Sequence, residues 1–219
     1  MKTKILLGIT AVLMLVSLYM DLIWVPAEQK MGDIQRIFYL MVPTGWLALL
    51  AYTVVFIGSI GYLATRQEKW DLVARASAEI GIVCTTLACI VGPIWAKKAW
   101  GVWWNWDPRL TATVVLWLIY LSYILVRSFA TEESRGARFA AVVGIIGFID
   151  VPIVALATSL WRGVHPPPLI FEGGLAPSMS LTLMISITAF TCLFAVLLIV
   201  RTSLNKNEAD LKVMKGLLS

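Results

Sequence analysis

Charged residues are scarce in this chain. Only 14% of its 219 residues are charged, 59% are hydrophobic, and the mean hydropathy is +0.83. A soluble domain of this length would not usually carry so little charge. Runs of roughly 20 apolar residues recur, and each is long enough to cross a bilayer as a helix. The composition therefore predicts an all-α polytopic membrane protein, with residues 1–219 forming a single membrane domain.

Cysteine is also rare, with three residues in the chain. Cys84, Cys89 and Cys192 lie inside apolar runs and form no Cys-x-x-Cys pair, so we interpret them as small core residues. No Cys-x-x-Cys-His sequence occurs, so we expect no covalently attached c-type haem on this chain. The net charge of +5 does not indicate nucleic acid, because the charges lie at the ends of apolar runs.

The apolar runs predict six transmembrane helices, at about 5–25, 37–64, 77–96, 111–128, 138–160 and 179–201. Six spans place both termini on one side of the membrane. That side would hold twelve basic residues: Lys2, Lys4, Arg66, Lys69, Arg75, Arg127, Arg135, Arg138, Arg201, Lys206, Lys212 and Lys215. The other side would hold six: Lys30, Arg36, Lys97, Lys98, Arg109 and Arg162. The bias predicts cytoplasmic termini, with 202–219 as a basic cytoplasmic tail forming a surface helix.

A tryptophan-rich segment, 95–111, lies on the predicted outer face. It contains Trp95 and then, within seven positions, four more: Trp100, Trp103, Trp104 and Trp106. An interfacial aromatic belt explains one or two tryptophans at the end of a span, but not four so close together. Gly101 and Pro108 argue against one continuous helix, so we expect an irregular or short amphipathic segment. The residues alone favour a membrane belt and a platform for a large planar ligand about equally.

Two further residues on the same face are candidate metal ligands. His165 is the only histidine, and the three prolines that follow it restrict where its imidazole can point. A lone histidine is more often structural or exposed, although neutral imidazole is a common ligand. Met41 begins the second span, two residues before Pro43. Methionine at such a position is usually a core residue, but its sulfur can also be an axial ligand of haem iron.

Charged residues near these candidates have less certain roles. Asp107 and Arg109 can pair with each other, or Asp107 can cap the fourth span. Arg109, Arg36 and Arg162 are candidate partners for haem propionates, with solvated or headgroup-facing charges as the alternative. Asp150 lies inside the fifth span, where an acid is a functional candidate. Because Pro152 follows it, we favour a structural role at a helix break.

At these residues the chain resembles a known family. "WGVWWNWDPRLT" resembles the WWD segment of the CcmC/CcmF/CcsA family of haem-handling membrane proteins in cytochrome c biogenesis. The size, the six spans and the stretches "RIFYLMVPTGW" and "DVPIVALATSLWRGVHPPP" are similar to the CcmC branch of that family.

The resemblance implies a multi-pass protein of the inner (cytoplasmic) membrane that binds haem b non-covalently and transiently at the periplasmic face. It implies delivery of haem to the chaperone CcmE, with CcmD, CcmA and CcmB as partners, by a transfer protein rather than a conventional enzyme. Haem would lie on the WWD segment between two axial histidines. His165 matches the second. Met41 takes the place of the first, because the family has Tyr-Ile-His-Val-Pro where this chain has Tyr-Leu-Met-Val-Pro at 39–43.

This departure leaves three hypotheses for the iron: a His165/Met41 pair, His165 alone with an open site, or loss of function. For the whole protein, the alternatives are the membrane core of a cytochrome c synthase and a permease subunit that binds no cofactor.

Overall fold

The protein is a bundle of membrane-length helices. A computed structural model describes residues 2–28, 31–130, 132–161 and 174–218. The α-helices are α1 (Lys2–Tyr19), α2 (Phe38–Thr65), α3 (Glu68–Trp100), α4 (Pro108–Ser128), α5 (Glu133–Gly147), α6 (Asp150–Leu160) and α7 (Pro177–Leu218). A π-helical turn, Met20–Trp24, extends α1, and a 3-10 helix, Asp33–Ile37, precedes α2. Within the described residues, six segments are long and apolar enough to cross a membrane, which confirms the predicted all-α polytopic fold.

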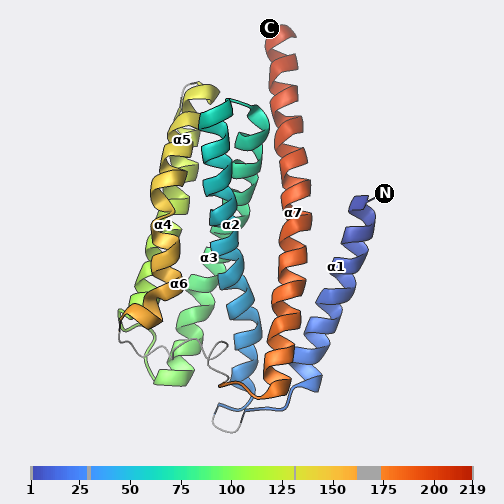
Figure 1. The fold of residues 1–219 in the computed structure, drawn as a ribbon, viewed down its shortest axis with the longest axis vertical. Coiled ribbons are helices and arrows are strands. Elements are labelled where there is room, and N and C mark those ends of the chain that lie inside the picture. The colour runs from blue at the N-terminus through green and yellow to red at the C-terminus, as the bar shows by residue number, and fades with distance from the viewer. Residues whose placement is uncertain (1, 29–30, 131, 162–173, 219) are drawn as a thin grey trace.

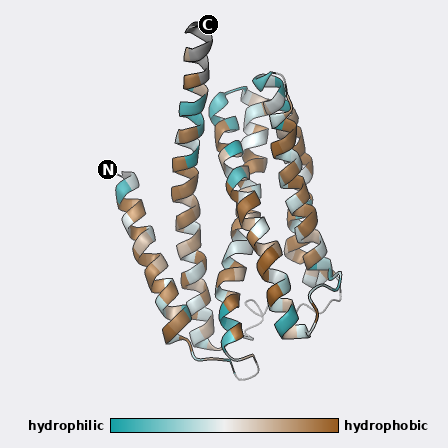
Figure 2. Ribbon diagram, turned by 180° about the vertical axis from the view of Figure 1, so that it is seen from behind, coloured by the Kyte–Doolittle hydropathy of each residue, from teal (hydrophilic) through white to brown (hydrophobic). Residues whose placement is uncertain are grey.

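The helices form two unequal groups (Figure 1). Helices α2 to α6 make a compact bundle, and α7 packs on α2 and α3 beside it. Helix α1 packs mainly on α7, where the buried hydroxyls of Ser17 and Ser186 lie 2.9 Å apart. Seen from behind, hydrophobic residues fill the middle of the helices and hydrophilic residues gather towards their ends (Figure 2). This distribution is that of a bundle whose middle lies in lipid.

The fifth span consists of two helices. Helix α5 ends at Gly147 and α6 begins at Asp150, so the break falls where the sequence placed it. Pro152 lies in the first turn of α6, where its missing N–H costs no helical hydrogen bond. Asp150 is only 8% exposed, and its Oδ2 has no hydrogen-bond partner among the described residues.

Buried tyrosines hold the bundle together. Tyr52 and Tyr120 are fully buried and meet edge to face, with ring centroids 4.9 Å apart. The Tyr120 hydroxyl donates to the Ala48 carbonyl at 2.7 Å, and the Tyr52 hydroxyl donates to the Val143 carbonyl at 3.3 Å. Each ring therefore packs in the core while its hydroxyl is satisfied by the backbone of another helix. Cys84 is buried nearby and, like the half-buried Cys89 and Cys192, is a free thiol.

We expect Gly81→Ala to destabilise the bundle, because α3 and α4 approach closely at this glycine. A Cβ at position 81 would collide with the buried Tyr120 hydroxyl and ring. Overpacking of this kind costs about 1–3 kcal/mol. Thermal unfolding in detergent should show a lower midpoint. Gly45→Ala is the matched control, since nothing lies within 4 Å of its Cβ and alanine favours a helix. Equal midpoints for the two variants would contradict the close contact.

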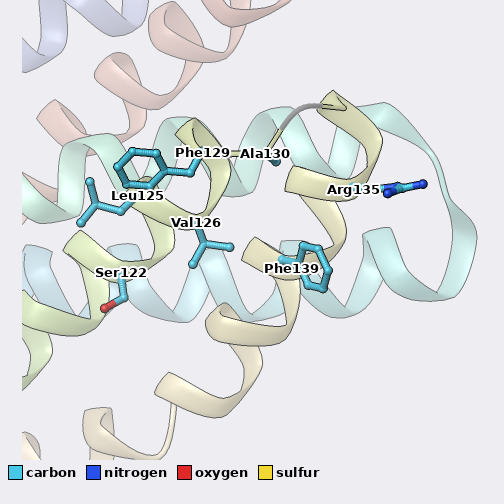
Figure 3. Close-up of a pocket in the computed structure, with 7 residues that line it drawn as sticks. All are labelled: Ser122, Leu125, Val126, Phe129, Ala130, Arg135 and Phe139. Atoms are coloured by element: carbon cyan, nitrogen blue, oxygen red, sulfur yellow. The ribbon is translucent and has the colours of Figure 1, made fainter.

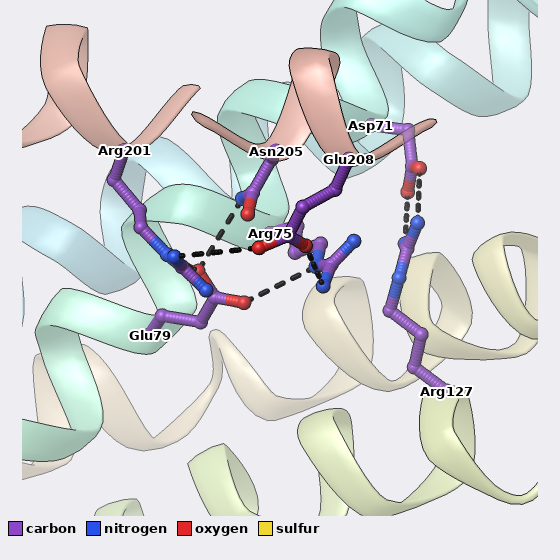
Figure 4. A network of polar contacts seen from close by, with 7 residues as sticks. All are labelled: Asp71, Arg75, Glu79, Arg127, Arg201, Asn205 and Glu208. Carbon is purple, nitrogen blue, oxygen red and sulfur yellow. Dashed lines mark hydrogen bonds and ion pairs between the residues drawn. The ribbon is translucent and has the colours of Figure 1, made fainter. Parts of the chain in front are cut away.

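Helix α3 begins nine residues earlier than the predicted third span, at Glu68 instead of 77. The extra turns contain charged residues that find partners on other helices (Figure 4). Asp71 receives two hydrogen bonds from the Arg127 guanidinium of α4, at 2.5 and 2.6 Å. Glu79 receives hydrogen bonds from Arg75, Arg201 and Asn205. Paired in this way, the charges are compatible with a continuous helix.

The tail is helical as predicted, but it is not a separate surface helix. Helix α7 continues to Leu218 without interruption and extends past the neighbouring helices (Figure 1). Neither glycine nor proline occurs between Pro177 and Gly216, so nothing in the sequence breaks the helix. Asn205, within the predicted tail, is fully buried and donates to Glu79 at 3.3 Å. The first turns of the tail are therefore part of the packed structure.

Candidate functional site

The tryptophan-rich segment is an irregular connection between two helices, as its glycine and proline predicted. Helix α3 ends at Trp100, and Gly101 follows with a φ of 80°, in the left-handed region where glycine is favoured. The Lys97 ammonium donates to the Gly101 carbonyl at 2.9 Å. Pro108 is the first residue of α4, where its fixed φ suits a helix start. Residues 101–107 are thus held at both ends by helices.

The indole rings form two perpendicular pairs. Trp95 and Trp100 are 5.2 Å apart between centroids, and Trp104 and Trp106 are 5.8 Å apart. Trp103 is 59% exposed and Trp106 is 76% exposed. Exposed aromatic surface that is concentrated in one short segment typically marks a site of interaction.

Trp106 has a strained backbone. Its φ is 55°, in a region that bulky residues rarely occupy and that costs about 1–3 kcal/mol. The surrounding contacts maintain this conformation: the Asp107 amide donates to the Asn105 side chain at 3.3 Å, and Asp107 itself is buried. Strain of this kind clusters at binding sites, and it leaves the Trp106 ring exposed.

Asp107 caps α4. Its carboxylate accepts a hydrogen bond from the Arg109 amide at 3.0 Å, and its carbonyl accepts one from Thr111 at 2.9 Å. Of the roles that the sequence left open for Asp107, the structure thus supports the helix cap. The cap fixes the direction in which α4 leaves the tryptophan segment, and with it the position of Arg109.

Met41 on α2 and Arg109 on α4 each lie on the helix face that carries the contact between Tyr120 and Ala48. The Tyr120–Ala48 hydrogen bond joins these helices deeper in the bundle. Met41 precedes Ala48 by seven residues and Arg109 precedes Tyr120 by eleven. Both intervals are close to whole numbers of turns, so each residue shares a helix face with that contact. At 1.5 Å per residue, Met41 lies about 10 Å and Arg109 about 16 Å from it towards the tryptophan segment. Met41, which is partly buried, is therefore the deeper of the two.

Two buried polar groups near the tryptophan segment could not be identified from the sequence. The Trp95 indole nitrogen and the Thr111 hydroxyl are buried and have no hydrogen-bond partner among the described residues. An unpaired buried donor costs about 1–3 kcal/mol, so each is a natural partner for a ligand oxygen. Trp95 belongs to the tryptophan segment, but its Nε1 lacks a partner because the ring is buried in the folded protein, and no local pattern reveals such burial.

Three predicted residues remain: Arg36, Arg162 and His165. Arg36 donates to the Asp33 carboxylate at 3.0 Å and to the Asp21 carbonyl at 2.6 Å, so it fastens the connection between α1 and α2. Its role towards a propionate stays a prediction. His165 and Arg162 lie outside the described residues. The connection that carries them leaves the end of α6, and α6 packs on α4 and α2.

The described residues fit haem by their chemistry. Trp103 and Trp106 offer an exposed apolar surface, Met41 a thioether, and Trp95 and Thr111 buried polar atoms that need partners. Arg109 adds a cation for a carboxylate. The set combines a large apolar area with a few polar contacts, as expected for a site that holds a planar, amphipathic ligand.

Comparison with known proteins gives a consistent result. The family model for CcmC, described as heme exporter protein C, matches residues 1–215. The chain is 34% identical to heme exporter protein C of Bradyrhizobium diazoefficiens over 191 residues, which cover 86% of this chain and 72% of that protein. It is 29% identical to the Rhodobacter capsulatus protein of the same name, over 94% of this chain and 87% of that one. Identity to the Escherichia coli K12 protein is 30%, over 80% of this chain and 72% of that one. The chain therefore belongs to the CcmC, or haem exporter protein C, family.

Proposed function

We propose that this protein presents haem at the extracytoplasmic face of the inner membrane and delivers it to the chaperone CcmE, with CcmD, CcmA and CcmB as its partners. Its family supports a role in haem handling for cytochrome c biogenesis, and its six apolar helices support a multi-pass membrane protein. One observation carries the proposal: the exposed rings of Trp103 and Trp106 lie in a short segment anchored at the end of the bundle towards which Met41 and Arg109 also lie.

In this proposal haem is cargo, held non-covalently as haem b while it waits for the acceptor. The tryptophan rings cover the apolar faces of the porphyrin, and Arg109 binds a propionate. Met41 and His165 are the candidate iron ligands. Because residues 101–107 lie outside the helical bundle, a bound haem would remain accessible to a second protein on that side.

The proposal predicts that the exposed tryptophans retain haem. Protein purified from haem-replete cells should show a Soret band, and replacing both Trp103 and Trp106 with alanine should lower haem occupancy at least several-fold. Trp46→Ala is the matched control, because Trp46 is also exposed (44%) but lies on α2 and donates to Thr191. Stopped-flow transfer of haem to purified CcmE tests delivery.

The Soret band and the dependence on CcmE separate this function from the two alternative functions. A cofactor-free permease subunit would show no Soret band, alone or in complex with CcmE. A synthase would attach haem to apocytochrome thiols without CcmE. Either result, or equal haem loss in the Trp46 control, would overturn the proposal.

A further inference from the structure

A groove of about 600 Å³ lies between α4 and α5, at the opposite end of the bundle from the tryptophan segment. Its lining consists of Ser122, Leu125 and Val126 on α4, Phe129 and Ala130 in the connection, and Arg135 and Phe139 on α5 (Figure 3). The haem proposal makes no use of this groove.

The lining is apolar, and it faces outward from the bundle. Leu125 is 41% exposed, Phe139 59% and Phe129 81%. Both helices are membrane spans, so this surface meets lipid. Ser122 is seven residues before Phe129, which places it about 10 Å deeper in the bilayer. The groove therefore follows the direction of a lipid acyl chain.

Among the described residues of the lining, the one charged side chain lies at the end of the groove nearest water. Arg135 is in the first turns of α5, and its side chain is 65% exposed (Figure 3). Arg138, also exposed, follows three residues later on the same side of the helix. An apolar channel that ends in arginines complements an anionic phospholipid, whose phosphate can bind a guanidinium in bidentate fashion.

Acidic neighbours do not prevent this contact. Glu132 accepts from Arg135 Nε at 2.9 Å, but its side chain is 58% exposed. Exposed ion pairs contribute little to stability, and a guanidinium has five N–H donors, so the contact with Glu132 does not exhaust them. Glu133 is the other acid nearby in the sequence.

We propose that this groove binds one anionic phospholipid of the leaflet on the side of the termini, which is the cytoplasmic leaflet in the predicted topology. The acyl chain lies along Ser122, Val126 and Phe139, and the phosphate binds Arg135 with help from Arg138. The lipid would fill the space between the ends of α4 and α5.

Native mass spectrometry of the full chain in detergent tests this site. The probes are phosphatidylglycerol and phosphatidylcholine with identical acyl chains. Wild type should bind phosphatidylglycerol several-fold more tightly. Arg135→Gln should weaken phosphatidylglycerol binding several-fold and phosphatidylcholine binding less, because the choline cation already offsets the charge of the phosphate in that lipid, so the preference should fall. Ser122→Trp, which fills the groove, should weaken both. Lys206→Gln is the control, since it removes an exposed cation on α7, which lies away from the groove.

Two results would overturn the proposal: an unchanged lipid preference in Arg135→Gln, or an equal loss in Lys206→Gln. A photo-crosslinker at Val126 that captures a polypeptide instead of lipid would also contradict it. Because Arg135 is exposed, its variant gives a decisive answer even if Ser122→Trp does not fold.

Discussion

Replacing Asp71 with alanine should lower the free energy of unfolding by about 3–5 kcal/mol, the usual cost of leaving one charge of a buried ion pair without its partner. The Asp71 and Arg127 side chains are only 9% and 12% exposed. Their two parallel hydrogen bonds, at 2.5 and 2.6 Å, join α3 to α4 (Figure 4). Without Asp71, the Arg127 guanidinium stays charged and must move to reach water.

A double variant distinguishes a lost ion pair from lost packing. Asp71→Leu combined with Arg127→Met removes both charges but keeps apolar volume, and such replacements are often neutral or stabilising. We therefore expect it to unfold near the wild-type midpoint in a denaturant titration. Asp33→Ala is the matched control: its carboxylate pairs with Arg36 but is 81% exposed, so the cost should stay below about 1 kcal/mol. A single variant as stable as this control would contradict the argument.

The same charges show what the sequence could and could not predict about the fold. Hydropathy located all six spans, because an apolar run long enough to cross the bilayer seldom forms anything but a membrane helix. It placed the start of the third span too late, since Asp71 and Arg75 look like loop residues when considered alone. Their partners on other helices, Arg127 and Glu208, are 56 and 133 residues away from Asp71 and Arg75. Pairing at such separations depends on how helices pack, which local patterns do not report.

In the candidate site too, some features could be predicted from the sequence and others could not. Gly101 and Pro108 predicted an irregular connection, because each has a strong backbone preference. The left-handed backbone of Trp106 was not predictable, since tryptophan has no preference for that region. The orphaned nitrogen of Trp95 was also hidden, because it arises from burial between helices. The topology with cytoplasmic termini and the propionate roles of Arg36, Arg109 and Arg162 stay predictions.

Met41 takes the place of a histidine that the family resemblance predicts, and its replacement should change the axial-ligand spectrum of bound haem. Met41 is partly buried on α2, on the helix face that includes Ala48, where its thioether can approach a ligand beside the tryptophan segment. If the iron has a His165/Met41 pair, Met41→Leu should abolish the sulfur-ligand features while keeping the packing, because this swap nearly conserves volume. Met41→His should give a bis-histidine spectrum and a lower reduction potential.

The three hypotheses for the iron then predict different results. With a His165/Met41 pair, the wild-type haem favours the ferrous state, and His165→Ala and Met41→Leu each remove one ligand. With His165 alone, Met41→Leu leaves the spectrum unchanged, and only His165→Ala releases the haem. A chain that has lost function binds no haem in any of these variants. Met31→Leu, in the connection before α2, controls for general effects of losing a methionine. Since a thioether stabilises ferrous iron relative to a second imidazole, the potential of the wild type measured against Met41→His also shows whether this departure changes the redox state in which haem is held.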